Sequence, residues 1–247
     1  MSNRIELSRE GHLLHIALNR PEKRNALDVA MCRALAGALE EASADPSVRA
    51  VLLTGNGKSF CAGMDLDEIL DASTGGVDEA HERLFAIGSR METPIVAAVH
   101  GAALAGGTGL AANCHVVVAA EDAKFGLTEI RIGLWPFLIF RAVAAAVGER
   151  RAVEMALTGR VFGAEEAVRC GLAHYVAIAG EREARAHARE IALSLSHASP
   201  VAIRLGLRSL SESRGRSRAE GGEIARRLRE EVFRSEEFRE AIRTWKR

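Results

Sequence analysis

The sequence lacks the cysteine and charge patterns that mark several classes of protein. Its four cysteines, at positions 32, 61, 114 and 170, form no C-x-x-C pair and no Cys/His cluster with the spacing of zinc ligands. We therefore expect no metal site, and free thiols in a reducing cytoplasm. The 33 Lys and Arg residues balance the 33 Asp and Glu residues, so net charge gives no reason to expect a nucleic-acid partner.

Membrane and export signals are also missing. The first ten residues are polar and lack the apolar core of a signal peptide. No apolar run reaches the roughly 18 residues that a membrane-spanning helix needs. The longest weakly polar stretch, residues 94–110, is interrupted by glycines and a histidine. The sequence therefore predicts a cytoplasmic protein that does not insert into a membrane.

Three common catalytic signatures are absent as well. The glycines at 101, 106 and 107 suggest a phosphate loop, but no Lys-Ser or Lys-Thr pair follows them. Position 112 is Ala, so Gly107-x-Gly109 lacks the third glycine of a dinucleotide-binding fingerprint. No G-x-S-x-G motif occurs, which leaves a serine-hydrolase triad without support.

What the sequence does contain is enough apolar material for a large core. Hydrophobic residues make up 48% of the 247 positions, and charged residues make up 27%, a balance typical of a folded globular chain. Apolar strand-like runs alternate with helical patterns in the first 150 residues, which predicts an α/β class. The expected strands are 13–18, 48–53, 95–99 and 116–118, and the expected helices are 28–45 and 106–113.

Helical patterns dominate the rest of the chain. Only residues 172–178 read as a strand there, and the polar stretch 211–218 is expected to separate the last two helices, 200–210 and 223–245. We therefore predict a core over residues 1–197 and a C-terminal helical region over residues 198–247.

Two glycine-rich segments and one glutamate are the first candidates for chemistry. The segments 60–66 and 100–109 follow strands, so their backbone N–H groups are placed to bind an oxyanion. The alternative is glycine used only for tight packing. Glu129 has apolar neighbours in sequence, and burial would raise its pKa toward the range of a general acid or base. The alternative is a surface glutamate paired with Arg131 or Lys124.

Three histidines, His15, His100 and His115, lie in or beside apolar strands, and we expect them to be structural. Glu154 lies on a helical segment, where a salt bridge is expected.

Six ordered segments between residues 18 and 176 resemble the crotonase superfamily, also called the enoyl-CoA hydratase/isomerase family. They are residues 18–27 (LNRPEKRNAL), 51–55 with 60–66, 94–107, 125–134, 157–160 and 164–172. The resemblance implies an α/β, ClpP/crotonase-like spiral of repeated ββα units with a C-terminal helical trimerisation region. It also implies a homotrimer or a hexamer.

The resemblance further implies an acyl-CoA thioester substrate and no separate cofactor. By motif position, the backbone N–H groups of Met64 and Gly106 would bind the thioester oxygen, and Glu129 would be the catalytic carboxylate. The residues implied to bind CoA or the acyl group are Lys23, Arg24, Ala26, Ala62, Asp65, Leu66, Gly109, Trp135 and Phe137. Leu84, Phe85, Ile87 and Met91 are candidates for the acyl channel, with core packing as the alternative.

The sequence departs from the family pattern at two places. Two-carboxylate hydratases of the family have a first glutamate where this chain has Gly109, while Glu129 matches the second. Residues 135–140 (WPFLIF) replace a glycine-rich segment and should form a bulky, water-poor wall.

A single carboxylate favours Δ3–Δ2 isomerisation of an enoyl-CoA, because one base can remove a proton at one carbon and return it at another. The alternatives are a hydratase assisted by His115, Asp67 or Glu68, a decarboxylase or thioesterase, and a non-catalytic CoA-binding protein.

Overall fold

The computed structural model describes residues 4–71 and 75–245, and its core is built on a six-stranded sheet. The strand order is β1 (Ile5–Glu10), β2 (Leu13–Leu18), β3 (Ala50–Gly55), β4 (Ile95–Val99), β6 (Val116–Ala120) and β9 (Tyr175–Ala177). Within this sheet, β1 and β2 run antiparallel and the other neighbouring strands run parallel. Every residue of β3 and β4 is buried, because helices cover both faces of a parallel sheet. The predicted α/β class is confirmed.

A second, smaller sheet lies beside the first and shows how the chain coils. It consists of β5 (Ala102–Leu104), β7 (Lys124–Gly126) and β8 (Phe162–Gly163). β4 pairs with β6 in the large sheet, while β5 and β7, the strands that follow them, pair in the small one. A bridge between Cys61 and Ala103 extends the small sheet toward the segment after β3. Successive turns of the chain therefore stack as a spiral.

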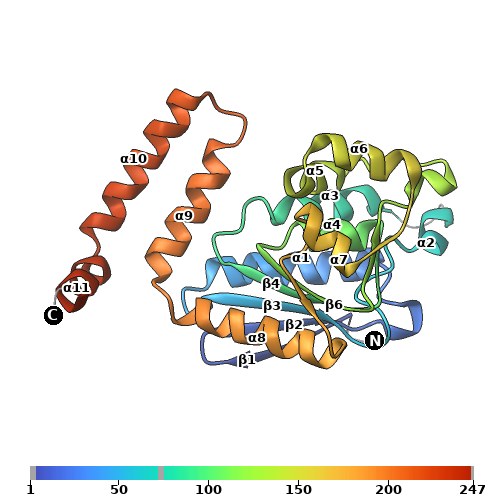
Figure 1. The fold of residues 1–247 in the computed structure, drawn as a ribbon, viewed down its shortest axis with the longest axis horizontal. Helices are drawn as coiled ribbons and strands as arrows, with labels where there is room; N and C mark the ends of the chain where they lie inside the picture. The colour runs from blue at the N-terminus through green and yellow to red at the C-terminus, as the bar shows by residue number, and fades with distance from the viewer. Residues whose placement is uncertain (1–3, 72–74, 246–247) are drawn as a thin grey trace.

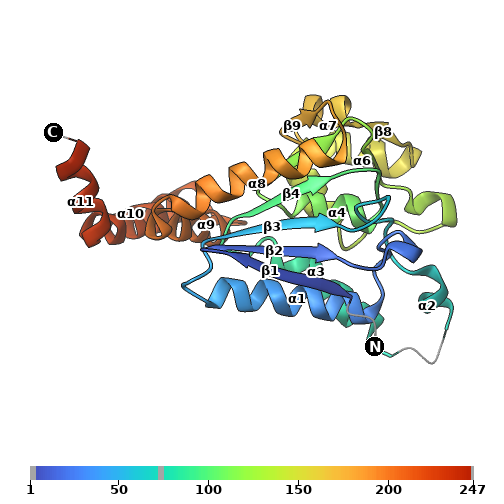
Figure 2. The same ribbon diagram turned by 90° about the horizontal axis from the view of Figure 1, so that it is seen from below.

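Helices cover the two faces of the large sheet differently. On one face, α8 (Glu181–His197) packs through the buried side chains of Ala184, Ala188 and Ala192, whose spacing of four residues keeps one helix face against the strands. On the other face lie α1 (Val29–Ala44) and α3 (Val77–Ile87) (Figures 1 and 2). Ala103, Phe125 and Phe162 of the small sheet belong to the same buried cluster as these two helices.

Shorter helices connect these elements. They are η1 (Pro21–Lys23), α2 (Leu66–Leu70), α4 (Gly106–Ala112), η2 (Glu129–Ile132), α5 (Phe140–Val147), α6 (Glu149–Thr158) and α7 (Ala164–Cys170). The expected helix over 28–45 is confirmed as α1, because the Asp28 side chain accepts the Met31 N–H at 2.7 Å and caps its first turn.

The last three helices extend away from the core in both views (Figures 1 and 2). They are α9 (Pro200–Ser213), α10 (Arg218–Arg234) and α11 (Glu236–Trp245). α8 ends at His197, and Ser199 then caps α9 by accepting the Ala202 N–H. That this turn divides two domains, at residues 197 and 198, stays a prediction.

Some sequence-based boundaries were wrong for identifiable reasons. The expected strand over 172–178 covers only Tyr175–Ala177, because the N–H groups of Leu172 and Ala173 both bind the Ala167 carbonyl at the end of α7. The expected helix over 223–245 is two helices, since the Ser235 hydroxyl contacts the Val232 carbonyl and accepts the Phe238 N–H. Strands β1, β5, β7 and β8 and helices α2, α3 and α5 were missed.

In the part of the chain that the structure describes, no helix combines the length and the apolarity needed to cross a bilayer.

Candidate active site

Two backbone turns, residues 60–66 after β3 and residues 100–106 after β4, come into close contact. A Cβ atom built on Gly107 would lie 2.1 Å from the Cys61 carbonyl oxygen, so only glycine permits this approach. Gly63 has a φ of +105°, and its own Cβ would lie 3.5 Å from the Gly106 nitrogen. Tight packing is therefore a real function of these glycines, and it is what places the two turns side by side.

The two turns present free hydrogen-bond donors. Among the described residues, the backbone N–H groups of Met64 and Gly106 have no acceptor. Gly106 begins α4, and the first N–H groups of a helix have no partner within it. Ala105, just before it, has φ 49° and ψ −118°, a strained conformation for a residue with a Cβ atom. The Thr108 hydroxyl holds this start in place, 2.6 Å from the Ala103 carbonyl oxygen.

Glu129 provides a buried carboxyl group. It begins η2, three residues after the end of β7, Lys124–Gly126, and 6% of its surface is exposed. Its Oε2 atom is buried and has no hydrogen-bond partner, while Arg131 and Lys124 lie exposed and form no ion pair with it. Burial raises the pKa of Glu129 to about 6, and a hydrogen bond from a backbone N–H opposes this shift. The alternative of a paired surface glutamate is therefore wrong.

One cavity of about 390 Å³ joins these groups. Met64, Gly106 and Glu129 line it, as do two other predicted residues, Trp135 and Phe137. Its remaining lining residues come from α3 and from the segment before α5: Asp78, Glu82, Phe85, Leu134, Pro136, Leu138 and Ile139. Of the four acyl-channel candidates only Phe85 lines the cavity, while Leu84, Ile87 and Met91 are buried in the core.

Gly109, in contrast, does not line the cavity, because Ile139 covers it. A Cβ atom on Gly109 would lie 2.3 Å from the Ile139 Cγ2 atom and 3.3 Å from the Phe85 Cε1 atom. The space beside Gly109, where the resemblance to two-carboxylate hydratases implies a glutamate, is thus filled with hydrocarbon. Gly109 was predicted as a residue of the substrate site, and the structure places it behind the cavity wall.

The predicted wall, residues 135–140, is held by one contact within it and by another just before its first residue. Trp135 packs against Phe140, with ring centroids 5.5 Å apart. The Leu134 N–H donates to the Glu129 carbonyl oxygen at 3.1 Å, so the wall begins from the turn that carries the carboxyl group. Phe137 is 72% exposed and lies at the rim. The predicted wall is therefore bulky, and it is open to solvent at one end.

The other residues implied to bind CoA gather around η1 and α2, beside Met64. The Ala62 N–H donates to the Arg24 carbonyl oxygen at 3.0 Å. Asp65 is buried, accepts from the Arg20 guanidinium at 2.5 Å and caps α2. Lys23 forms an exposed ion pair with Asp67 at 2.6 Å. Ala26 and Leu66 lie in the same two segments. A nucleotide-binding role for this set stays a prediction.

The three groups suggested as a second acid lie outside the cavity. His115 accepts the Ile95 N–H at 2.9 Å, and burial lowers its pKa to about 4. Asp67 is paired with Lys23, and Glu68 accepts the Val29 N–H at the start of α1. Sequence reasoning missed Asp78 and Glu82, because α3 was not recognised as a helix. It placed Ile139 in the wall but did not predict its contact with Gly109.

His15 and His100 are structural as expected. His15 contacts the Thr54 hydroxyl at 2.9 Å, and His100 contacts the Gly57 carbonyl at 2.8 Å.

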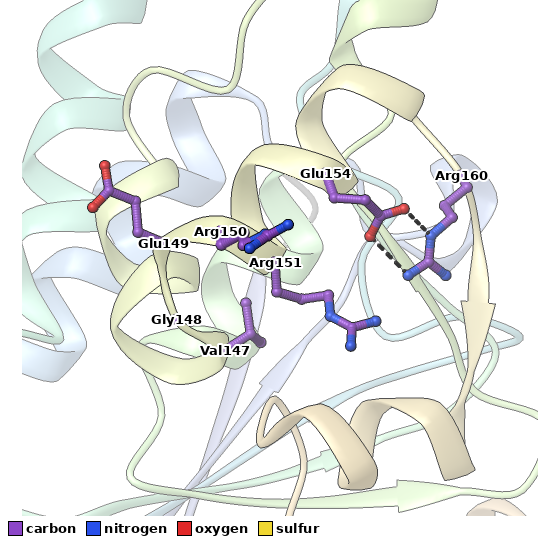
Figure 3. Close-up of a pocket in the computed structure, with 7 residues that line it drawn as sticks. All are labelled: Val147, Gly148, Glu149, Arg150, Arg151, Glu154 and Arg160. Carbon is purple, nitrogen blue, oxygen red and sulfur yellow. Dashed lines mark hydrogen bonds and ion pairs between the residues drawn. The ribbon is translucent and has the colours of Figure 1, made fainter.

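A second hollow, of about 620 Å³, lies at the junction of α5 and α6 (Figure 3). Its arginines Arg150 and Arg151 are exposed. Glu154 accepts two hydrogen bonds from Arg160, which confirms the salt bridge expected for this helix. Arg160 also contacts Glu166, so its charge is neutralised. No lining residue of this hollow is both ionisable and buried, and it offers no counterpart to Glu129.

Comparison with known proteins decides the family. Residues 8–247 match the family model described as Enoyl-CoA hydratase/isomerase. The chain belongs to the enoyl-CoA hydratase/isomerase family. Its membership confirms the resemblance to the crotonase superfamily and shows that the chain is an enzyme of this family.

Relatives and solved structures agree with this assignment across almost the whole chain. A Thermus thermophilus protein that carries the provisional name enoyl-CoA hydratase is 38% identical over 96% of this chain and 95% of its own. The 2,3-dehydroadipyl-CoA hydratase of Escherichia coli is 34% identical over 84% of this chain and 81% of its own.

The enoyl-CoA hydratase structure from Mycobacterium smegmatis superposes with a TM-score of 0.92 at 27% identity, covering 98% of this chain and 95% of that one. The crotonase-like fold with its C-terminal helices is therefore confirmed. Membership in the hydratase/isomerase family leaves open which of the two reactions the chain catalyses.

Proposed function

We propose that this enzyme moves the double bond of an enoyl-CoA thioester between the Δ3 and Δ2 positions, with Glu129 as the proton shuttle. One observation carries the proposal: the side chain of Ile139 occupies the space beside Gly109. The cavity therefore has one buried carboxyl group next to two free backbone donors, and no second carboxyl group at position 109.

The reaction needs only these groups. The N–H groups of Met64 and Gly106 would donate to the thioester oxygen of a 3-enoyl-CoA. The Glu129 carboxylate would remove a proton from C2, and the negative charge would move to that oxygen as a dienolate. The protonated Glu129 would then return the proton to C4, which leaves the double bond between C2 and C3. No water enters, and the enzyme regains its starting state.

The magnitudes fit such a mechanism. One oxyanion donor typically lowers the barrier by about 3–4 kcal/mol, and a placed general base adds a rate factor of about 10²–10⁴. A pKa of about 6 lets Glu129 both accept and return a proton near neutral pH. An ordinary surface carboxylate, with a lower pKa, would return the proton less readily.

Hydration of a 2-enoyl-CoA is the second candidate. The relatives named as hydratases favour it, and Asp78 and Glu82 bring two further carboxylates to the cavity. Hydration needs a water molecule held between two proton-transfer groups. Both carboxylates on α3 are solvent-exposed, whereas Glu129 is buried, so they are poorly suited to hold a single water molecule in place.

The test supplies the purified protein with 3-hexenoyl-CoA and, separately, with 2-hexenoyl-CoA, and identifies the products by chromatography. We expect the 3-enoyl substrate to give the 2-enoyl product faster than either gives a 3-hydroxyacyl product. Dominant hydration would contradict the proposal. Release of free CoA would instead indicate thioester cleavage, and binding without any turnover would indicate a CoA-binding protein.

A homotrimeric or hexameric assembly is also proposed. Within the described chain, α9–α11 bury only two large apolar side chains, Leu205 and Leu228. Leu210, Phe233 and Trp245 on the same helices stay exposed. Apolar side chains exposed in this way on projecting helices are typical of a surface that another subunit covers.

A further inference from the structure

The cavity carries charge of one sign only. Among the described residues that line it, the ionisable ones are Asp78, Glu82 and Glu129, and none is Lys, Arg or His. The whole chain has no net charge, but the environment of this cavity is acidic. A ligand group entering this cavity meets carboxylates and apolar side chains.

Asp78 and Glu82 belong to one face of α3. They are four residues apart, and Phe85, which also lines the cavity, follows three residues later, so all three side chains lie on the same helix face. Neither carboxylate has a hydrogen bond or an ion pair with any described residue. Glu40, by contrast, is an exposed glutamate that is paired with an arginine, Arg83.

The stability of α3 does not explain the pair. Asp78 lies in the first turn, where the helix dipole favours a negative charge. Glu82 lies in the middle of the helix and has no such benefit. Two like charges four residues apart weaken a helix, so this arrangement opposes the formation of α3.

Glu129 independently marks the cavity as a ligand site. Its side chain is more than nine-tenths buried, lines the same cavity and has an unpartnered Oε2 atom. Together with Met64 and Gly106 it fixes the reacting end of the ligand. The exposed pair Asp78 and Glu82 lines the same cavity from another element, α3, which leaves it free to contact a part of the ligand other than the reacting end.

We propose that Asp78 and Glu82 select acyl chains that carry a cationic ammonium group at their far end, and reject chains that end in a carboxylate. This rests on the proposed function, in that the ligand is an acyl-CoA thioester. The aliphatic part of the chain packs along the wall from Leu134 to Ile139. The aromatic faces of Trp135 and Phe137 add to the attraction of a cation.

The test measures binding, so that it does not depend on the reaction catalysed. Three saturated thioesters of matched length are titrated into the full-length protein by calorimetry: hexanoyl-CoA, adipoyl-CoA and 6-trimethylammoniohexanoyl-CoA. The last has a fixed positive charge and no free amine that could attack the thioester. We expect it to bind about tenfold more tightly than adipoyl-CoA, because each exposed charge pair changes affinity by a factor of up to about five.

Variants test whether Asp78 and Glu82 cause the selection of cationic acyl chains. In the double variant Asp78→Asn with Glu82→Gln, the ratio of the affinity for 6-trimethylammoniohexanoyl-CoA to that for adipoyl-CoA should fall to about one. The affinity for hexanoyl-CoA should stay within about twofold of the wild-type value. Glu79→Gln is the matched control, because Glu79 is an exposed carboxylate on the same helix that does not line the cavity. It should leave the ratio unchanged. In wild type, 0.5 M salt should reduce the ratio, since salt screens exposed charges.

Equal affinities for the three thioesters, tightest binding of adipoyl-CoA, or an unchanged ratio in the double variant would overturn the selection. Failure of the isomerase proposal has a different signature: selective binding without conversion of 3-hexenoyl-CoA. Conversion of 3-hexenoyl-CoA without selective binding would contradict only the proposed selection by Asp78 and Glu82. If none of the three thioesters binds, both the isomerase proposal and the selection proposal are wrong.

Discussion

At the scale of single residues, the site depends on a carboxyl group whose burial works against the fold. Glu129 is held beside free backbone donors without a partner for Oε2. Its raised pKa, about 6 against an ordinary 4.5, means that ionising it is harder in the native state than in the unfolded chain. Stability is therefore lost as pH rises from about 4.5 to 6, and the loss is complete above this window, at about 2 kcal/mol.

The variant Glu129→Gln should separate function from stability. We expect turnover to fall at least about 10²-fold, because the proton shuttle is gone. At pH 7.5 the variant should be more stable than wild type by up to about 2 kcal/mol, and this difference should vanish near pH 4.5. Enzyme assays and chemical denaturation at the two pH values check both parts. A variant with unchanged turnover would exclude Glu129 as the base.

The same pKa predicts the pH profile of the reaction. With Glu129 as the base, kcat/KM for 3-hexenoyl-CoA should rise about tenfold per pH unit below pH 6 and level off above it. Initial rates between pH 5 and pH 8 test this. A profile that is flat across pH 6 would mean that another group accepts the proton.

Even an alanine side chain at position 109 should destabilise the folded protein. Gly109→Ala places a Cβ atom against Ile139, and we expect it to lower the free energy of unfolding by about 1–3 kcal/mol. Combining it with Ile139→Ala should recover part of that loss, because the new methyl group then has room. Denaturation of both single variants and the double variant gives the coupling energy. Strictly additive effects would contradict the contact.

At the scale of structural elements, the site depends on the contact between the turns after β3 and β4. Gly107→Ala would bring a Cβ atom within 2.1 Å of the Cys61 carbonyl oxygen, so the turns must separate. We expect a loss of about 10²-fold in kcat, comparable to the removal of an oxyanion donor, with smaller effects on overall stability.

Gly37→Ala is a suitable control for the substitution Gly107→Ala. Gly37 lies inside α1, and nothing lies within 4 Å of the position that a Cβ atom would take there. The substitution should therefore keep activity and raise stability by about 0.5–1 kcal/mol, because alanine favours a helix. Equal activity losses in both variants would show that the contact of the turns has no special role.

The elements also show what could and could not be predicted from the sequence. Motif positions identified Met64, Gly106 and Glu129, because the residues and their order carry the information. They did not reveal the contact between Ile139 and Gly109, which joins positions that are far apart in the sequence. The strands β5, β7 and β8 have three, three and two residues, too short for a periodic pattern to be visible.

At the scale of the whole molecule, the spiral explains why the α/β class was predictable. Two of its turns contribute the fully buried strands β3 and β4, and these continuous apolar runs are easily recognised. The paths of α9–α11 were less predictable, since hydrophobic patterns identify helices but not the surface they cover. Ser235 divides α10 from α11 through side-chain hydrogen bonds that spacing alone does not reveal.

The exposed apolar side chains of the C-terminal helices predict self-association. We expect light scattering to give the mass of a trimer or a hexamer of the 26.5 kDa chain. Trp245, which is 90% exposed in the single chain, lies in this helical region, and its fluorescence should shift to shorter wavelength on assembly. A monomer at micromolar concentration would contradict the assembly.

The packing of Ile139 on Gly109 has an evolutionary consequence. A glutamate introduced at 109 would meet an occupied site, and a smaller residue introduced at 139 would open an unfilled hole. Each of these two single substitutions is thus disfavoured without the other. A carboxylate at position 109 therefore requires two coordinated substitutions, so descendants that keep this pair of residues are expected to keep position 109 without an acid while the rest of their surface diverges.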